Sequence, residues 1–285
     1  MLRRLALVSL LVLAALAFCE RPAPLALGSF NIRMFPNAKT DLEAVAHAIA
    51  GLDADAFAVQ EIVEPRVFQR VLERASAISG RRYRVALEHA HCPRRGTNFY
   101  LGVVHDADKL ALIESRLLGE FTCPEGQPAG MLAHLRASDG RRLALTSLHL
   151  SAGDKRMAQW AWLAAALPDL RAELDAPVIL AGDFNSTGYL VERDLERRFI
   201  DTLVERSGLQ LATARLACSM YWKPPRSATY EVSLLDHIVA PRELELGPAQ
   251  VMGMCAELAC APQTGMPTAW HEVSDHCPVR VELRP

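Results

Sequence analysis

The chain has 285 residues, of which 51% are hydrophobic and 22% charged, and its formal net charge is −2. This composition is that of a globular protein and excludes a disordered or low-complexity chain. The near-zero charge gives no overall basic surface, so a nucleic-acid ligand would need a local patch. The sequence has no internal repeat and no long linker, and one domain with a substantial core is expected.

The first residues have the layout of a secretory signal peptide. MLRR is a positively charged start, LALVSLLVLAALA is an apolar stretch, and Ala-Leu-Ala at its end fits a cleavage site. We therefore expect a signal peptide at 1–17, a spacer at 18–24, a single domain at 25–285 and an exported protein, periplasmic or secreted. A lipid anchor on Cys19 is the alternative, although Phe18 stands where such anchors normally have a small residue.

Export to an oxidising compartment permits disulfides among the seven cysteines. Proximity in the sequence suggests the pairs Cys92–Cys123 and Cys255–Cys260, although spacing does not determine connectivity. Cys277 lies at the start of an apolar strand and is interpreted as a small buried residue. No CxxC motif and no Cys/His cluster has the spacing of a structural zinc site.

Strand and helix patterns alternate along the chain, which predicts an α/β or α+β fold. The expected strands are 25–35, 56–62, 83–87, 99–104, 131–136, 141–150, 178–181, 233–240 and a closing strand after 276; the expected helices are 41–52, 67–78, 155–174 and 199–207. Asp41 or Thr40 is a candidate N-cap for the first helix. Residues 214–233 are expected to be irregular.

The rest of the chain is organised around the stretch VILAGDFNST at 178–187. An apolar strand ends at Gly182, and Asp183 and Asn185 follow two residues apart. In an extended backbone, both side chains would project to the same side, into the space beyond the sheet edge. The alternatives are an Asx turn that caps backbone N–H groups and, for Asn185, glycosylation of the Asn-Ser-Thr sequon.

Polar residues recur at the predicted strand ends, which suggests one shared site. They are Asn31, Glu61, His149, Asp183, Asn185, Asp236, Asp275 and His276. Carboxylate and amide oxygens suit Mg²⁺, Mn²⁺ or Ca²⁺ rather than zinc, and histidines provide acid–base capacity near neutral pH. A metal, a water-activating carboxylate and an imidazolium together describe hydrolysis at phosphorus.

The motifs GSFNIR, VQEI, SLHLSAG, LAGDFN, SLLDHIV and SDHCPV occur in this order. They resemble the ordered motifs of the endonuclease/exonuclease/phosphatase superfamily, the deoxyribonuclease I-like proteins, over roughly 25–283. The resemblance implies a four-layer αββα sandwich, in which two packed mixed β-sheets are flanked by helices. It also implies a single catalytic domain that cleaves phosphodiesters or phosphomonoesters with a divalent metal, expected to be Mg²⁺, with Mn²⁺ or Ca²⁺ as alternatives.

The resemblance also implies a role for each site residue. Glu61 is the expected principal metal ligand, with Asn31 and Asp275 beside it. Asp183 and Asn185 are expected to position the attacking water and stabilise the transition state. The remaining expected catalytic residues are His276 at the phosphate, Asp236 as a supporting carboxylate and His149 as the second histidine. Because the abasic-site repair branch usually has tyrosine at that position, His149 favours the deoxyribonuclease and sphingomyelinase branches.

Some of these residues also have structural interpretations. Asn31 could be only a turn residue and Asp236 only a structural partner, while His237 is expected in the core on the opposite face of its strand. Candidate substrate-binding residues are Arg156, Tyr221, Trp222 and Arg226, because aromatic and basic side chains bind bases or head groups.

The sequence favours a monomeric, exported, metal-dependent phosphodiesterase, with an endonuclease acting on DNA or RNA as the first candidate. A sphingomyelinase-type enzyme that binds a lipid head group, or a phosphomonoesterase, is the alternative within the enzymes. A non-catalytic binding module of the same fold is the alternative of another class, which a missing metal ligand or histidine would mark.

Overall fold

The computed structural model describes residues 23–92, 97–118, 130–153, 155–189 and 194–284. The expected signal peptide, Cys19 and Cys123 lie outside them. None of the helices in this part of the chain is long and apolar enough to cross a membrane.

Strands and helices alternate as the sequence predicts. The strands are β1 (Leu25–Phe35), β2 (Ala56–Ile62), β3 (Tyr83–Cys92), β4 (Thr97–Asp106), β5 (Leu110–Leu118), β6 (Gly130–Ala137), β7 (Arg142–His149), β8 (Val178–Asp183), β9 (Leu209–Leu211), β10 (Met220–Trp222), β11 (Glu231–Ser233), β12 (Asp236–Pro241), β13 (Gln250–Val251) and β14 (Val279–Leu283). The helices are α2 (Leu42–Leu52), α3 (Pro65–Ser79), α4 (Lys155–Leu174), α5 (Asp194–Arg206), α6 (Met254–Glu257) and α7 (Thr268–Glu272).

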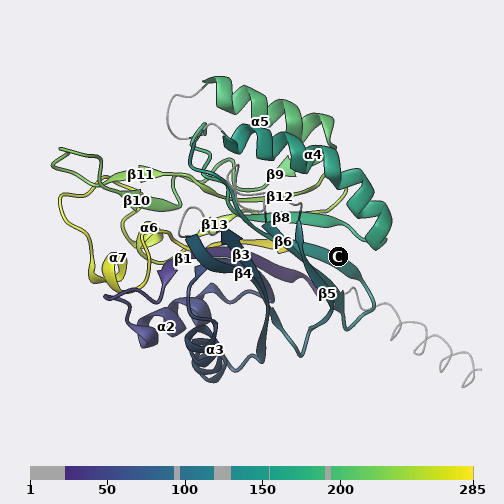
Figure 1. Ribbon diagram of the computed structural model, residues 1–285, viewed down its shortest axis with the longest axis horizontal. Helices are drawn as coiled ribbons and strands as arrows, with labels where there is room; N and C mark the ends of the chain where they lie inside the picture. The colour runs from purple at the N-terminus through teal and green to yellow at the C-terminus, as the bar shows by residue number, and fades with distance from the viewer. Residues whose placement is uncertain (1–22, 93–96, 119–129, 154, 190–193, 285) are drawn as a thin grey trace, which may run out of the picture.

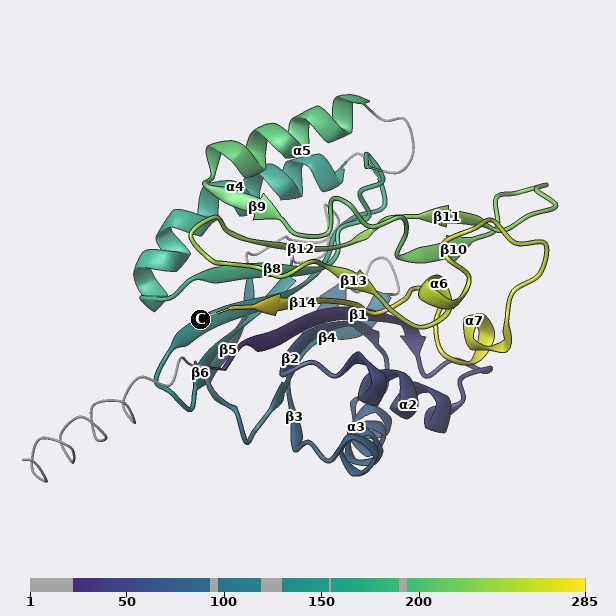
Figure 2. The same cartoon turned by 180° about the vertical axis from the view of Figure 1, so that it is seen from behind.

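Two six-stranded mixed sheets form the centre of the molecule. One has the order β13-β14-β1-β2-β4-β3 and the other β5-β6-β7-β8-β12-β9. Within them β1 pairs with β2 and β7 pairs with β8 in parallel, while the other pairs are antiparallel. Helices α2 and α3 cover the outer face of the first sheet, and α4 and α5 that of the second (Figures 1 and 2). The predicted four-layer sandwich is therefore confirmed.

Three apolar layers hold the sandwich together. The central one fills the space between the sheets, the second packs α4 and α5 on their sheet, and the third packs α2 and α3 on theirs. Strand β8 is buried along its whole length because a sheet lies on one side of it and helices on the other. Asp41 is the N-cap of helix α2, as expected, and its side chain accepts hydrogen bonds from the amides of Glu43 and Ala44.

Several predicted element boundaries were wrong. Strands β3 and β4 are longer than expected, β5 was not predicted, and α5 starts at Asp194 rather than Phe199. The segment 214–233, expected to be irregular, contains β10 and β11, which pair antiparallel as a hairpin. These two strands have three residues each, too few to show an alternating pattern clearly.

The cysteine pairing also differs from the prediction. Disulfides join Cys218 to Cys260 and Cys255 to Cys277, so the predicted Cys255–Cys260 pair is wrong. Cys277 is buried as expected, but as half of a disulfide. The expected Cys92–Cys123 pair involves a residue outside the described part of the chain. The two observed bonds connect segments 42 and 22 residues apart, which proximity in sequence could not indicate.

Candidate active site

The second sheet aligns three of the predicted site residues at one edge. His149 at the end of β7 and Asp236 at the start of β12 are both in register with Asp183 at the end of β8. Gly182 precedes Asp183 with φ of 150°, and a Cβ there would lie 2.1 Å from the carbonyl oxygen of Leu148. Glycine is therefore required for β8 to lie this close to β7 before it delivers Asp183 to the edge.

The first sheet provides Asn31 and Glu61 at the same end of the sandwich. The pairing of β1 with β2 shifts register between Asn31 and Phe35, and the residues between them include Arg33 and Met34 with φ of 48° and 45°. Glu61 is also left-handed, with φ of 63°. The amide of Met34 donates to Glu61 Oε2 at 2.8 Å, so the bulge of β1 holds this carboxylate in place.

The two sheets meet at the Asp183 carboxylate. Asn31 Nδ2 lies 3.1 Å from both Asp183 Oδ2 and Glu61 Oε1, and it donates a hydrogen bond to each. His149 Nε2 lies 3.6 Å from Asp183 Oδ2 and 3.7 Å from Glu61 Oε1. His276 Nε2 is 3.8 Å from the same Asp183 oxygen. One carboxylate oxygen therefore faces two imidazoles and a carboxamide.

His276 is oriented by a buried carboxylate. Its Nδ1 lies 2.8 Å from Asp236 Oδ2, and its backbone amide donates to the hydroxyl of Ser274 at 3.1 Å. Burial alone would lower the pKa of His276, but the carboxylates of Asp236 and Asp183 outweigh burial and raise that pKa well above the usual value. The imidazole thus presents Nε2 toward Asp183, and the two neighbouring carboxylates favour its protonated form.

Asp275, the third predicted metal ligand, forms an ion pair with Arg33. Its Oδ2 is 3.5 Å from Arg33 Nε, and this guanidinium also donates to the carbonyl of Trp270 at 3.1 Å and lies 4.3 Å from the centre of the Trp270 ring. Arg33 was not among the expected site residues. The only signal for it was its place in the NIR motif two residues after Asn31.

The prediction that Asn185 lies on an extension of the strand is wrong. Its φ is 51°, and its amide donates to Asp183 Oδ1 at 2.8 Å, which closes the Asx turn considered as the alternative. Its side-chain nitrogen donates to the carbonyl of Leu150 at 2.8 Å. The turn and the site coexist because Asp183 uses Oδ1 for the backbone and Oδ2 for the neighbouring side chains.

The donor chemistry of Asn31, Glu61 and Asp183 fits a hard divalent cation. The carboxylates of Glu61 and Asp183 face the amide nitrogen of Asn31, while its amide oxygen accepts from the backbone amide of Arg33 at 3.0 Å. Carboxylate and amide oxygens are ligands that suit Mg²⁺. Within the described ranges, no three His, Cys, Asp or Glu side chains form a cluster that could hold a metal ion by themselves. A bound ion would therefore complete its coordination with water and substrate oxygens, as Mg²⁺ commonly does.

Two of the four predicted substrate-binding residues are structural. Arg156 is buried, and its Nε donates to Glu196 Oε1 at 2.7 Å, which joins α4 to α5. Tyr221 is fully buried, and its hydroxyl donates to the carbonyl of Ala261. Both side chains are therefore withdrawn from a substrate. Trp222 is 42% exposed and Arg226 is also exposed.

His237 is buried in the core, as the alternation of β12 predicts. Its Nδ1 lies 2.9 Å from the hydroxyl of Thr213 and its Nε2 lies 3.3 Å from the carbonyl of Ser186. Burial lowers the pKa of this imidazole to about 4. It therefore stays neutral in the folded protein at pH values where the unfolded chain is already protonated.

This difference predicts an acid-sensitive stability. Because the folded pKa of His237 lies below the unfolded value, the unfolded chain binds more protons as pH falls from about 6.5 to about 4, and stability is lost in that window. Between pH 7.5 and 5 this histidine should remove about 2 kcal/mol of unfolding free energy. Urea denaturation of the wild type and His237→Asn at both pH values measures the difference. An equal acid loss in the variant would contradict the assignment.

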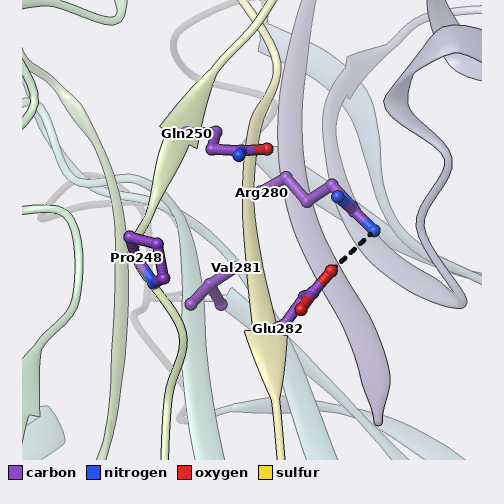
Figure 3. Close-up of a pocket in the computed structure, with 5 residues that line it drawn as sticks. All are labelled: Pro248, Gln250, Arg280, Val281 and Glu282. Carbon is purple, nitrogen blue, oxygen red and sulfur yellow. Dashed lines mark hydrogen bonds and ion pairs between the residues drawn. The ribbon is translucent and has the colours of Figure 1, made fainter.

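A small pocket of about 70 Å³ lies away from this site. It is lined by Pro248, Gln250, Arg280, Val281 and Glu282 beside β13 and β14, with Arg280 bonded to Glu282 across 3.4 Å (Figure 3). None of the predicted site residues lines it. The pocket is therefore separate from the group formed by Asn31, Glu61, His149, Asp183 and Asp236.

The sequence matches the profile of the Endonuclease/Exonuclease/phosphatase family over residues 28–276. The chain belongs to this family. Members of the family are phosphoric ester hydrolases and generally depend on divalent metal ions. No curated protein matches the chain significantly.

Solved structures of family members share the fold. An endonuclease/exonuclease/phosphatase family protein from Bacteroides thetaiotaomicron has a TM-score of 0.67 and 18% identity, covering 93% of this chain and 96% of that one. A mannosyl-6-phosphatase from the same organism has a TM-score of 0.64 and 19% identity, with 91% and 99% covered. D. rerio TDP2, solved with a single-strand DNA product, has a TM-score of 0.64 and 17% identity, with 93% and 100% covered.

Proposed function

We propose that this member of the Endonuclease/Exonuclease/phosphatase family is an exported, Mg²⁺-dependent phosphodiesterase that acts on nucleic acid. The observation behind the proposal is the pair of histidines, His149 and His276, whose Nε2 atoms lie 3.6 and 3.8 Å from one oxygen of Asp183. A carboxylate between two imidazoles can accept a proton from water while the imidazoles serve the phosphate and its leaving alcohol.

Each residue then has a distinct part in hydrolysis. Asp183 accepts a proton from the attacking water, whose oxygen forms the new bond to phosphorus. Protonated His276 donates a hydrogen bond to a non-bridging phosphate oxygen, and Asp236 keeps it protonated and oriented. The bond to the ester oxygen breaks, and His149 is placed to protonate the departing alkoxide. A divalent ion held by the Glu61 carboxylate, with Asn31 beside it, would supply Lewis-acid stabilisation of the phosphoryl charge.

The comparisons are compatible with a diester and with a monoester substrate. Solved relatives at similar TM-scores include a mannosyl-6-phosphatase and a TDP2 with a single-strand DNA product. Diesters and monoesters both release an alcohol whose oxygen needs a proton donor, and the two histidines beside Asp183 can serve either. The diester is placed first because exposed Trp222 and Arg226 offer a ring and a cation to a polynucleotide strand. A sugar phosphomonoester is the second candidate, supported by the equal structural likeness to the phosphatase.

The first experiment is hydrolysis by the purified protein with Mg²⁺ and with EDTA. Plasmid DNA, single-stranded DNA, RNA, sphingomyelin, a sugar phosphate and a bis-aryl phosphodiester are offered in parallel. We expect EDTA-sensitive cleavage of a nucleic acid and of the bis-aryl diester, and loss of at least ~10³-fold activity in Asp183→Asn. Turnover of sphingomyelin or the sugar phosphate alone would replace the nuclease assignment, and full activity in EDTA would contradict the metal requirement.

A further inference from the structure

Residues 220–233, hereafter the arm, project beyond the ends of the two large sheets near α7 (Figures 1 and 2). The arm contacts the segment that contains Asp275 and His276. The amide of Tyr221 donates to the carbonyl of Asp275 at 3.0 Å, and Met220 forms a β-bridge with His276. Trp270 Nε1 donates to the carbonyl of Tyr221 at 3.0 Å. The base of the arm therefore has a fixed position beside the site.

A row of two aromatic rings with a cation at each end runs from the site onto the arm. The Arg33 guanidinium lies 4.3 Å from the Trp270 ring centre, and the Trp270 and Tyr230 rings meet edge to face at 5.4 Å. Lys223 Nζ lies 5.1 Å from the Tyr230 ring centre. Each cation is thus held against an aromatic ring, which limits its conformational freedom.

The two cations of this row differ in whether a carboxylate pairs with them. Arg33 is shared with Asp275, and its side chain is still 34% exposed. Lys223 is exposed, and among the residues that the structure describes no carboxylate lies within ion-pair distance of it. Because the three contacts are 4.3, 5.4 and 5.1 Å long, the two cationic groups lie within about 15 Å of each other. The Trp270 and Tyr230 rings lie between them along this row.

We propose that Arg33 and Lys223 form a phosphate track that binds a neighbouring phosphate of a single polynucleotide strand while the scissile phosphate lies at Asp183. This inference rests on the proposed function and adds that the substrate is a strand with more than one phosphate. A polyanion is favoured over a membrane surface because the turn of the arm contains Lys223, two prolines and Arg226, and Trp222 is its one large exposed apolar side chain.

The track predicts that Lys223 matters more for a strand than for a small ester. In Lys223→Ala, the ratio of kcat/KM for a single-stranded oligonucleotide to kcat/KM for the bis-aryl phosphodiester should fall about fivefold or more. The loss should be in KM, and the salt dependence of log KM should weaken by about 0.7 for one lost contact to a single strand. Arg142→Ala removes an exposed cation at the start of β7, far from His149, and should leave the ratio unchanged.

Each outcome separates the track from the proposed function. If the wild type hydrolyses the bis-aryl diester but the ratio is the same in Lys223→Ala, the track is wrong and the function stands. If the wild type hydrolyses no diester at all, the proposed function fails first. If Lys223→Ala instead abolishes co-sedimentation with phosphatidylserine vesicles and leaves the ratio intact, the arm binds a lipid surface and the track is overturned. Circular dichroism verifies folding of both variants.

Discussion

Replacing His276 with glutamine is expected to lower kcat by about two to four orders of magnitude while the protein stays folded. His276 presents Nε2 to Asp183 at 3.8 Å and is held by Asp236 at 2.8 Å, so it is the imidazole whose charge and direction are set by the fold. Glutamine retains a hydrogen-bond donor and loses the positive charge that stabilises the phosphate oxygen in the transition state. Steady-state hydrolysis of the bis-aryl diester, together with a thermal melt, measures both effects.

Two further variants make this result specific. Asp236→Asn keeps the shape of the buried partner and removes its charge, so kcat should fall at least ~10-fold because the protonated imidazole loses its stabilising carboxylate. His47→Gln changes an exposed histidine of α2 that pairs with Glu43 and should keep full activity. If His276→Gln retained a third or more of the wild-type kcat, the proposed role of the His276 charge at the phosphate would be wrong.

Loss of the Cys255–Cys277 disulfide is the second change with a large expected effect. This bond closes a segment of 22 residues, and its removal should cost about 3 kcal/mol of unfolding free energy. Cys277 directly follows His276, and its amide donates to the carbonyl of Ser219, whose hydroxyl accepts from the amide of Asp236. The double variant Cys255→Ser/Cys277→Ser should therefore lose at least ~10-fold in kcat even at temperatures where it is folded.

The measurement combines denaturation with activity assays below the melting temperature. Treating the wild type with a reductant should reproduce the loss, and the double variant should respond less to the same reductant. The contradictory result is a folded double variant with wild-type kcat, which would show that backbone hydrogen bonds alone position His276. An enzyme that needs this bond would be fully active only after reaching an oxidising compartment, in keeping with the proposed export.

The core of the site could be predicted because its residues follow apolar strands in short, ordered motifs. A buried strand such as β8 must end at the sheet edge, so a polar Asp183 directly after it lies at that edge whatever the rest of the chain does. The same reasoning applied to Glu61 and His149. The sequence suggested one shared site, and in the structure Asn31 bonds to Glu61 of the first sheet and to Asp183 of the second.

The rim of the site could not be predicted in the same way. Tyr221 and Arg156 have the residue types of substrate contacts, yet both are buried by segments that are distant in sequence. Arg33 was missed because its role depends on Trp270 and Asp275, more than two hundred residues later in the chain. Exposure and partner choice at a surface depend on such long-range contacts, which local periodicity does not encode.

The sequence by itself determined the fold class, the strands that end in the site and the chemical type of the site, because buried strands and their polar ends leave local patterns. Only the tertiary structure decided the pairing of the cysteines, the Asx turn at Asn185 and the course of the arm. It also decided which aromatic and basic side chains face solvent. These features arise where segments far apart in sequence meet, so their energies depend on packing that exists only after the two sheets have come together.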